Sequence, residues 1–426
     1  MKMAQAGVKV ARNHVKHAAK SSLGISKNRD ELHRDNARDL YRELGDLKGS
    51  ALKMAQMLSQ DQNMVPGAYR DQFKMAQYNA PPLSYPLVRK VFQSEMGKGP
   101  NEVYDKFEPH AAHAASIGQV HIAWIDGRKL AVKVQYPGVA ESIRSDLRLA
   151  KPFATRIFNL NGAEVDHYFE EVESKMLEET DYILESRQAQ ESAERLGFLD
   201  GLRFPKYLDH LSTKKILVME YLEGKPLDLY VQDGPSQEER NSVGQKLWNL
   251  FDTMIREHQH VHADPHPGNF QVGPNGELQV LDFGCMKTIP ESFFKPFFSL
   301  MLSDIHKNSE KLETKLEELE LLLPQDTDNE REFYIETYRQ FILLLGQPFH
   351  EKSFDFSDRD FFLAIDKLSR TIQSSDLYKG SKRGRGSKHG LYVNRTYFGL
   401  YNLLHLLGAK INTSSDWREA LMGRPA

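Results

Sequence analysis

The sequence predicts a mixed α+β protein that divides into two or more lobes. Its 426 residues exceed what a single hydrophobic core usually organises. An alternating apolar stretch at 130–135 and an apolar run at 215–222 predict strands. A long stretch at 30–77 instead carries apolar residues three and four positions apart, which predicts amphipathic helix.

Composition excludes several classes of protein. The formal net charge of -3 argues against general nucleic-acid binding, so no DNA partner is expected. Cys285 is the single cysteine, so no internal disulfide can form, which fits a reducing compartment. We expect it to be a small buried residue rather than a reactive thiol. No apolar run reaches eighteen residues and no signal-peptide core opens the chain, so no transmembrane helix is predicted.

The first 29 residues form a basic amphipathic segment. They contain no acid, and their apolar residues recur at helical spacing. The basic residues are Lys2, Lys9, Arg12, Lys16, Lys20, Lys27 and Arg29. Three interpretations stay open: a helix on an anionic membrane surface, a solvated helix against the body, and an organellar transit peptide.

The helical pattern of 30–77 includes a methionine-rich face around Met54 and Met57. Three prolines at 81, 82 and 86 then predict a linker or lobe boundary, because proline interrupts helices. A further helix is expected from Leu87 to about Met96.

Small residues between 107 and 123 predict a strand, a tight loop and a second strand. Such a loop lets backbone N–H groups approach a phosphate. An alanine-rich stretch is also a common helix, so this signal is weak by itself. The next predicted strand places Lys133 among apolar neighbours, where a lysine is costly unless it meets an anion.

Acids cluster at 178, 179, 181 and 185, within a helical pattern. On one continuous helix Asp181 and Glu185 would share a face, so two carboxylates could converge on one site. A solvated acidic face is the alternative. The strand at 215–222 follows and ends in polar residues and Gly224.

Hard oxygen ligands are concentrated between Asp264 and Asp282. Asp264 and Asn269 are five residues apart, and Asp282 follows a short apolar strand and precedes Phe283 and Gly284. Mg²⁺ prefers carboxylate and amide oxygens, and phosphoryl transfer needs such a metal together with a carboxylate near the nucleophile. The pattern therefore predicts a magnesium–phosphate site, with Asp264 as the base or positioning group.

Two other interpretations of this segment exist. It can be a polar turn that joins two strands. Alternatively, His262, Asp264 and His266 are ligands of a transition metal, because alternate residues of an extended strand lie on the same face. The prolines at 265 and 267 disfavour the metal strand, because proline interrupts strand pairing.

Two features lie further along. The stretch 310–320 predicts a charged amphipathic helix whose acids form a solvated face. The stretch 379–390 is a basic, glycine- and serine-rich loop that we expect to be mobile, with contact to anionic lipid or RNA as the alternative.

These motifs occur in an order that resembles the ABC1 family of atypical protein-kinase-like proteins, also called the UbiB, AarF or Coq8 family. The resemblance runs from about Gly45 to about Leu407. Its motifs, in order, are Lys-x-Gly-Gln, an alanine-rich loop ending in Ser, Ala-Val-Lys, Glu-x-Asp-Tyr, Asp-x-x-x-x-Asn and Asp-Phe-Gly. The segment 394–401 resembles the C-terminal helices of the family.

The resemblance implies a bilobal protein-kinase-like fold with an N-terminal helical extension over the active-site cleft. In this scheme residues 1–80 form the extension, residues 81–222 the N-lobe and residues 223–426 the C-lobe. The cofactors implied are ATP or ADP and Mg²⁺.

Family roles transfer to individual positions. Catalytic roles fall to Asp264, Lys133 and Glu185, with Lys133 on the nucleotide phosphates and paired with Glu185. The nucleotide would also meet Ala114, Ala115 and Ser116 in the loop and Met219, Glu220 and Leu222 at the adenine hinge. Asn269 and Asp282 would hold Mg²⁺, and the regulatory residues would be Lys53, Gln56, Glu179 and Asp181.

Two positions depart from the family pattern. Ala55 replaces the glycine of Lys-x-Gly-Gln and lacks its backbone freedom. His113 replaces the first alanine of the loop with a larger, titratable residue. With both departures we still expect ATP to bind. The departures affect the degree of autoinhibition that the family resemblance implies.

The resemblance implies an ATP- and Mg²⁺-dependent kinase-like enzyme or ATPase that supports isoprenoid quinone biosynthesis. Its partners would be an anionic lipid surface or a quinone precursor, and other enzymes of that biosynthesis. Its location would be cytoplasmic, peripheral on the inner face of a membrane. A Ser/Thr protein kinase and a nucleotide-gated scaffold with little turnover are the alternatives.

Overall fold

The structure is a computed structural model, and it describes residues 83–115, 117–157, 162–301, 305–375, 377, 385–415, 417 and 421. The predicted helix at 30–77, the basic segment 1–29 and the extension 1–80 lie outside the described residues. Contacts divide the chain into two units. The first combines the described residues up to Arg187 with Lys206–Tyr221, and the second combines Gln188–Pro205 with those from Leu222 onwards.

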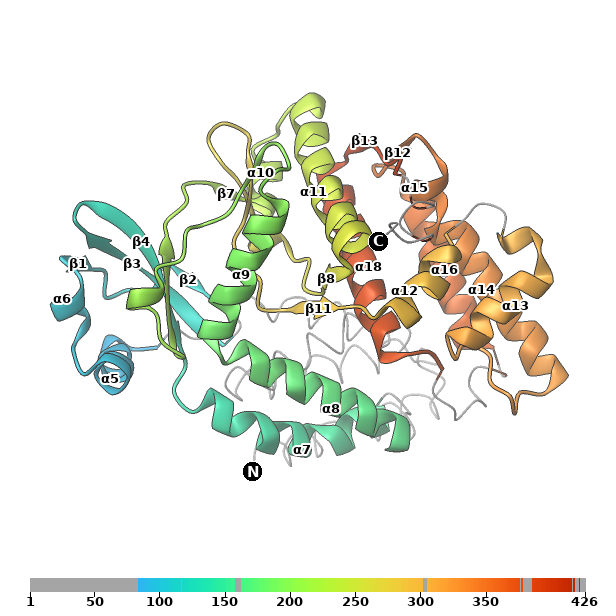
Figure 1. Cartoon of the computed structure of the whole chain (residues 1–426), viewed down its shortest axis with the longest axis horizontal. Coiled ribbons are helices and arrows are strands. Elements are labelled where there is room, and N and C mark those ends of the chain that lie inside the picture. The colour runs from blue at the N-terminus through green and yellow to red at the C-terminus, as the bar shows by residue number, and fades with distance from the viewer. Residues whose placement is uncertain are drawn as a thin grey trace, which may run out of the picture. The chain divides into compact units, whose positions relative to one another are not determined.

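The first unit is built on an antiparallel five-stranded sheet. Its strands are β1 (Lys106–Phe107), β2 (His113–Ala114), β3 (Gly118–Ile125), β4 (Arg128–Gln135) and β6 (Ile216–Glu220). The order is β1-β3-β4-β6, and β2 pairs with β3 (Figure 1). The strands expected at 130–135 and after 215, and the strand-loop-strand at 107–123, are therefore confirmed. The helical alternative for the alanine-rich stretch is wrong.

Helix α5 (Tyr85–Met96) packs on this sheet. Pro86 occupies its first turn, where its missing N–H costs nothing, and Gly97 ends it in the left-handed region at φ 69°. Val88 and Phe92 join Val132 in one buried cluster. The helix expected from Leu87 to Met96 is confirmed, with α6 (Pro100–Val103) after it.

Three helices follow β4: α7 (Val139–Ile157), α8 (Gly162–Glu179) and α9 (Tyr182–Leu196). Helices α7 and α8 lie side by side. The acidic run does not form one continuous helix, because α8 ends at Glu179. Asp181 instead caps the start of α9, where its Oδ1 accepts the backbone N–H groups of Ile183 and Leu184 at 3.1 and 3.2 Å. Asp181 and Glu185 still lie one helical turn apart at the start of α9, because the N–H of Glu185 donates to the carbonyl oxygen of Asp181 at 3.1 Å.

The second unit is mainly helical. Its long helices α11 (Gln237–His258) and α18 (Lys388–Leu407) lie side by side (Figure 1). The helix predicted around 394–401 is part of α18. The other helices are α10 (Leu227–Gln232), α12 (Glu291–Ser299), α13 (Ser309–Glu318), α14 (Asp328–Leu345), α15 (Gln347–His350) and α16 (Arg359–Ser374).

Three small sheets complete this unit. One has the order β5-β10-β9-β7, and two strand pairs are β8 with β11 and β12 with β13. The strands are β5 (Leu202–Arg203), β7 (Lys225–Pro226), β8 (His260–His262), β9 (Phe270–Val272), β10 (Leu278–Val280), β11 (Met286–Thr288), β12 (Ser353–Asp355) and β13 (Lys410–Asn412). Cys285, just before β11, is buried as expected.

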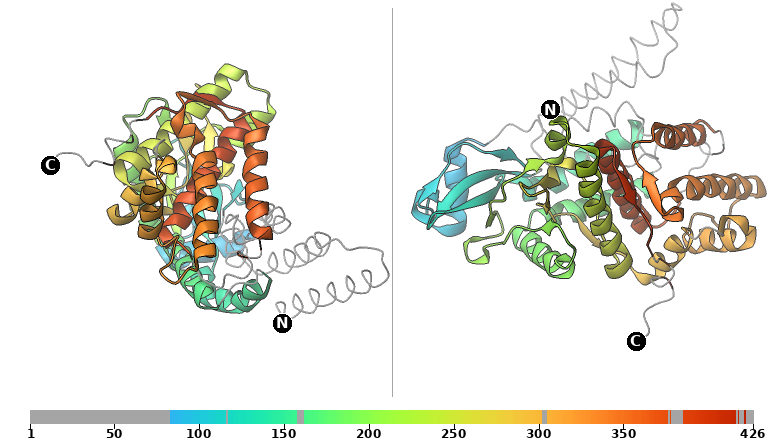
Figure 2. Two further views of the ribbon diagram at one scale, coloured as in Figure 1. Left: turned by 90° about the vertical axis from the view of Figure 1, so that its right-hand side faces the viewer. Right: turned by 90° about the horizontal axis from the view of Figure 1, so that it is seen from above.

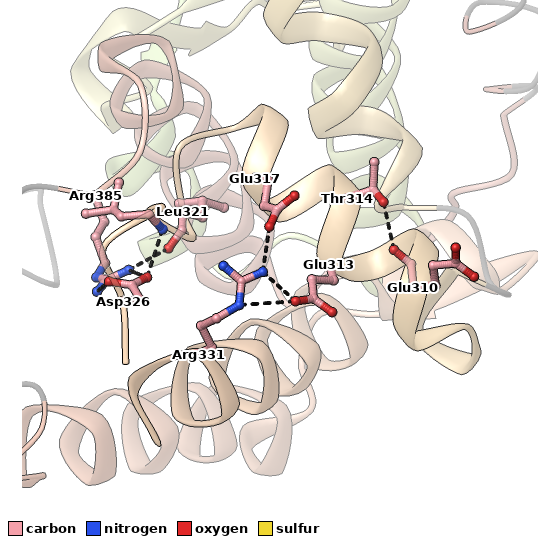
Figure 3. A network of polar contacts seen from close by, with 9 residues as sticks. Glu310, Glu313, Thr314, Glu317, Leu321, Asp326, Arg331 and Arg385 are labelled. Atoms are coloured by element: carbon pink, nitrogen blue, oxygen red, sulfur yellow. Dashed lines mark hydrogen bonds and ion pairs between the residues drawn. The ribbon is translucent and has the colours of Figure 1, made fainter. Parts of the chain in front are cut away.

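The acids of α13 lie at the surface, and two of them also pair with an arginine of α14. The next helix along the chain is α14, which lies beside α16; these are the two upright orange helices in the left view of Figure 2. On α14, Arg331 binds Glu313 and Glu317 of α13 (Figure 3). The charged helix and the solvated acidic face expected at 310–320 are confirmed, since the side chains of Glu313 and Glu317 stay 38% and 51% exposed although they pair with Arg331.

The basic stretch 379–390 also differs from expectation at its end. Residues 379–384 lie outside the described residues, but Arg385 is buried against Asp326, with N–O distances of 2.6 and 2.7 Å (Figure 3). Ser387 caps the N-terminus of α18, which begins at Lys388. The last residues of the predicted mobile loop are thus anchored. Among the described residues, no helix is both long and apolar enough to cross a membrane.

Candidate active site

The first unit holds a buried ion pair between β4 and α9. Lys133 Nζ lies 2.7 and 3.0 Å from the two carboxylate oxygens of Glu185, and the residues are 6% and 3% exposed. The pairing expected between these residues is therefore present. Two opposite charges removed from water in this way satisfy each other, and they hold the lysine side chain in one position.

Local structure fixes both partners. Lys133 lies in register with Val120 of β3 and Leu217 of β6, so its strand is paired on both sides. The turn before α9 is tied to the sheet, because Gln135 Nε2 donates to the carbonyl oxygen of Thr180 at 2.9 Å. The ring of Tyr182, the first residue of α9, lies 5.0 Å from Lys133 Nζ.

The expected nucleotide loop is the turn between β2 and β3. Ala114 ends β2, and the N–H of Ala115 donates to the carbonyl oxygen of Gly118 at 2.9 Å. Ser116 lies outside the described residues. A Cβ at Gly118 would collide with the carbonyl oxygen of Val134, so glycine is required for this close approach. His113 is exposed and leaves the turn accessible.

The expected hinge residues fall at the end of β6. Met219 is buried and lies in register with Ala131 of β4. Glu220 is partly exposed, and its backbone N–H donates to the carbonyl oxygen of Lys206 at 2.8 Å. Leu222 is also buried, and the chain re-enters the second unit at this residue.

In the second unit, Asn269 is the last residue of a short 3₁₀ turn, η3 (Pro267–Asn269), and Asp264 precedes this turn. Asn269 Nδ2 donates to the carbonyl oxygen of Asp264 at 2.8 Å. The backbone carbonyl oxygen of Asn269 accepts the N–H of Leu281 at 2.9 Å, which ties the turn to the segment that carries Asp282. Because its amide nitrogen is engaged, the Oδ1 atom of Asn269 is the side-chain atom that remains for a ligand.

Asp282 is held from two sides. Its Oδ1 accepts the N–H of Gly284 at 2.7 Å, and its carbonyl oxygen lies 2.8 Å from His262 Nε2. The other ring nitrogen of His262, Nδ1, accepts the N–H of Asp264 at 3.3 Å. A single buried histidine therefore connects the backbones of Asp264 and Asp282.

The transition-metal interpretation of His262, Asp264 and His266 is wrong. Both ring nitrogens of His262 are used, and His266 Nδ1 accepts the N–H of Gly268 at 3.1 Å. In the part of the chain that the structure describes, no group of three or more His, Cys, Asp and Glu side chains could hold a metal ion. The turn is a support for carboxylate and amide oxygens.

This donor set suits Mg²⁺, which takes hard oxygen ligands. The amide oxygen of Asn269 is oriented by the hydrogen bond of its own nitrogen, and the carboxylate of Asp282 is oriented by Gly284. Lys133 supplies a positive charge on the first unit of the kind that binds phosphate oxygens. The residues present therefore fit both a magnesium ion and a nucleotide phosphate.

Two supporting residues of α18 were not predicted from the sequence. Thr396 Oγ1 donates to the carbonyl oxygen of His262 at 3.1 Å. A Cβ added at Gly399 would overlap the ring of Pro265, next to Asp264. A glycine within a long helix is the signal that could have indicated this close contact, because glycine weakens helices and needs a packing reason.

The structure describes two of the four expected regulatory residues, Glu179 and Asp181. Lys53 and Gln56 lie outside the described residues. Glu179 is buried at the end of α8, and Asp181 caps α9. One helical turn before Glu179, the buried Lys175 binds Glu178.

Comparisons with known proteins agree with this architecture. Residues 75–316 match the model of the ABC1 atypical kinase-like domain. The chain is similar to AarF domain-containing protein kinase 1 of Xenopus tropicalis, with 34% identity over 59% of this chain and 50% of that protein. It is also similar to a probable serine/threonine-protein kinase, abkA, of Dictyostelium discoideum, with 27% identity over 80% of this chain and 64% of that protein.

A mitochondrial atypical kinase of Caenorhabditis elegans, coq-8, is 29% identical over 81% of this chain and 46% of that protein. The chain thus spans between about half and two thirds of the length of these curated relatives. A solved structure, the complex of Rv3197 with erythromycin from Mycobacterium tuberculosis, has a TM-score of 0.59 and 27% identity, and the match covers 90% of this chain and 95% of that chain. The fold is kinase-like, and the chain belongs to the ABC1 atypical kinase-like family.

Proposed function

We propose that this protein is a Mg²⁺- and ATP-dependent phosphoryl-transfer enzyme or ATPase. The buried pair of Lys133 and Glu185 is the observation that carries the proposal. Such a lysine, fixed by a glutamate of a neighbouring helix, is the arrangement that protein kinases use for the phosphates of ATP. A nucleotide-gated scaffold would also need this lysine to bind ATP, so the pair supports nucleotide binding, and the rate of turnover separates the two.

The residues of each unit have separate roles in the proposed reaction. Lys133 neutralises charge on the phosphate oxygens, and the turn after Ala114 offers backbone N–H groups to them. Asn269 and Asp282 hold the magnesium ion, which when bound neutralises phosphate charge. Asp264 orients the attacking hydroxyl or water and accepts its proton. His262 keeps the backbones of Asp264 and Asp282 in register.

For the acceptor we propose a small or lipid-like molecule of isoprenoid quinone metabolism, or water, at a membrane surface. The family resemblance and the basic segment 1–29 support this choice. The similarity to a mitochondrial atypical kinase named coq-8 is consistent with it. A Ser/Thr protein kinase is the second candidate, favoured by the similarity to the probable serine/threonine-protein kinase abkA.

The direct test is release of phosphate from ATP by the purified chain with Mg²⁺, with and without anionic vesicles. We expect vesicle-stimulated release that Asp264→Asn lacks, because the variant has no carboxylate to accept the proton. Release that is equal in the variant would contradict the assignment of Asp264.

Two further arms separate the acceptors. Transfer of labelled phosphate to a mixture of serine-rich peptides, without stimulation by vesicles, would favour the protein-kinase candidate. Deleting residues 1–29 should weaken binding to anionic vesicles and leave the basal ATPase rate unchanged. Equal vesicle binding after the deletion would remove the membrane part of the proposal.

A further inference from the structure

Two buried polar side chains of β3 take no part in the site described above. Gln119 and His121 are both 0% exposed and stand two residues apart, so they lie on the same face of the strand. Burying an amide and an imidazole is unfavourable unless both are hydrogen bonded. Their partners therefore indicate what they do.

His121 holds the chain that leads into β2. Its Nδ1 lies 2.8 Å from the carbonyl oxygen of Glu108, and a carbonyl only accepts, so Nδ1 carries the proton. In the neutral ring Nε2 is then an acceptor, and Gln119 Nε2 donates to it at 2.8 Å. Burial lowers the pKa of His121, which favours this neutral form.

The histidine in turn fixes the orientation of the Gln119 amide. Because the NH₂ group faces His121, the Oε1 atom faces Leu83 and accepts its backbone N–H at 2.6 Å. Leu83 lies just before α5. In the sequence it directly follows the segment that contains Lys53 and Gln56.

The same residues border the β2–β3 turn. Gln119 is in register with Ala114, the last residue of β2. Glu108, whose carbonyl His121 holds, precedes β2 by five residues, and its N–H donates to the carbonyl oxygen of Ile122 at 2.9 Å. One relay, from Glu108 through His121 and Gln119 to Leu83, thus holds the segment that enters the turn, the strand that leaves it and the start of α5.

We propose that Gln119, oriented by neutral His121, is a positioning residue that sets the β2–β3 turn for nucleotide binding and couples this turn to the chain at Leu83. This inference rests on the proposed function, since it assumes that the turn contacts nucleotide. It adds that nucleotide affinity depends on the direction of the hydrogen bonds in the relay.

The charges around His121 do not account for the relay. On the side of β1, Lys106 and Glu108 are exposed and pair with each other at 3.6 Å. His110 in the following loop lowers the pKa of His121. From β4 the residue in register is Val132, and Phe107 stacks on the imidazole with ring centroids 4.9 Å apart. Tyr85 of α5 stacks on Phe107 with ring centroids 6.2 Å apart.

The first experiment compares two buried substitutions in the full-length protein by titration with MgADP. Gln119→Met keeps the side-chain length and removes the hydrogen bonds of Gln119 with His121 and Leu83, and we expect the Kd to rise about tenfold. Val88→Ala is the matched control, because it creates a cavity in the core cluster on which Leu83 packs and removes no hydrogen bond of the relay. It should lower the melting temperature and leave the Kd within about twofold.

The second experiment reverses the relay. In Gln119→Glu the carboxylate cannot donate to His121, so the relay forms only when His121 is protonated and donates from Nε2. We expect this variant to bind MgADP weakly at pH 8 and to recover about fivefold, relative to wild type, at pH 6. A residue that merely supported folding would not reverse the pH profile.

Each outcome decides one question. Wild-type affinity in Gln119→Met, or a pH profile of Gln119→Glu parallel to that of wild type, would overturn the positioning role while leaving the proposed function intact. A wild-type protein that binds no MgADP would instead overturn the proposed function, and the coupling to nucleotide with it. A loss of affinity in Val88→Ala equal to that in Gln119→Met would show that stability alone is responsible.

Discussion

Lys133 and Glu185, on a strand and a helix 52 residues apart in the sequence, form a buried ion pair with N–O distances of 2.7 and 3.0 Å. A pair of this kind is sensitive to the removal of one partner, because the other charge is left in the interior. It therefore links the stability of the first unit to the proposed chemistry, and both can be measured in the same variants.

Lys133→Met should abolish turnover of ATP and destabilise the first unit by roughly 3–5 kcal/mol, because the buried Glu185 carboxylate loses its lysine partner. Urea unfolding followed by circular dichroism measures this change. The control is Lys106→Met, which removes an exposed pair with Glu108 on the same sheet and should cost about 0–1 kcal/mol. Equal effects of the two substitutions would contradict the account.

Gly399→Ala tests whether α18 supports the catalytic turn. Alanine is the better helix former by about 1 kcal/mol, yet its Cβ would overlap Pro265, so we expect a net destabilisation of about 1–3 kcal/mol and a lower kcat. Gly390→Ala in the same helix is the matched control, since the nearest atom to the added Cβ is 3.6 Å away. If both substitutions stabilise the protein, the contact with Pro265 has no energetic role.

The two arginines of Figure 3 should differ in their contribution to stability. Arg385 is buried against Asp326, whose side chain is 0% exposed, and its guanidinium lies 3.6 Å from the ring of Tyr334. Arg385→Ala should cost roughly 3–5 kcal/mol, because the buried carboxylate of Asp326 loses its guanidinium partner. Arg331→Ala removes more exposed pairs and should cost about 1 kcal/mol. Urea unfolding of the two variants provides the comparison, and a larger loss in Arg331→Ala would refute it.

Stability should fall as the pH is lowered below about 6.5. Burial lowers the pKa of His121 and of His258 from the ordinary value of 6.5, so the unfolded chain binds protons at a pH where the folded chain does not. The free energy of unfolding is then constant above 6.5 and decreases as the pH falls through the window below it. His258→Phe should make this decrease shallower between pH 6.5 and 5. An unchanged slope in the variant would argue that His258 is as easily protonated in the folded protein as in the unfolded one.

Strands and the residues at their ends could be predicted from the sequence, because period-two alternation and the placement of Lys133 between apolar neighbours are local signals. The partner of Lys133 could be named only by family resemblance. The spacing predicted one helix through Glu179, Asp181 and Glu185, but α8 ends at Glu179 and Asp181 caps the start of the next helix, α9. Local periodicity does not distinguish one helix from two that meet at a cap.

Long-range partners could not be predicted either. Arg385 appears in a basic, glycine-rich stretch, and only the fold brings Asp326 to it from 59 residues away. The contact of Gly399 with Pro265 and the hydrogen bond from the Leu83 N–H to Gln119 likewise depend on tertiary packing. Apart from the glycine within a helix at 399, no sequence pattern points to these residues or to their partners.

The central claim is that Asp282 and Asn269 hold magnesium for a nucleotide. Calorimetric titration of the wild-type chain and of Asp282→Asn with ATP, in Mg²⁺ and in EDTA, tests it most directly. We predict that wild type binds ATP at least tenfold more tightly in Mg²⁺ than in EDTA and that Asp282→Asn loses this difference. Mg²⁺-dependent binding of equal strength in the variant would contradict the account.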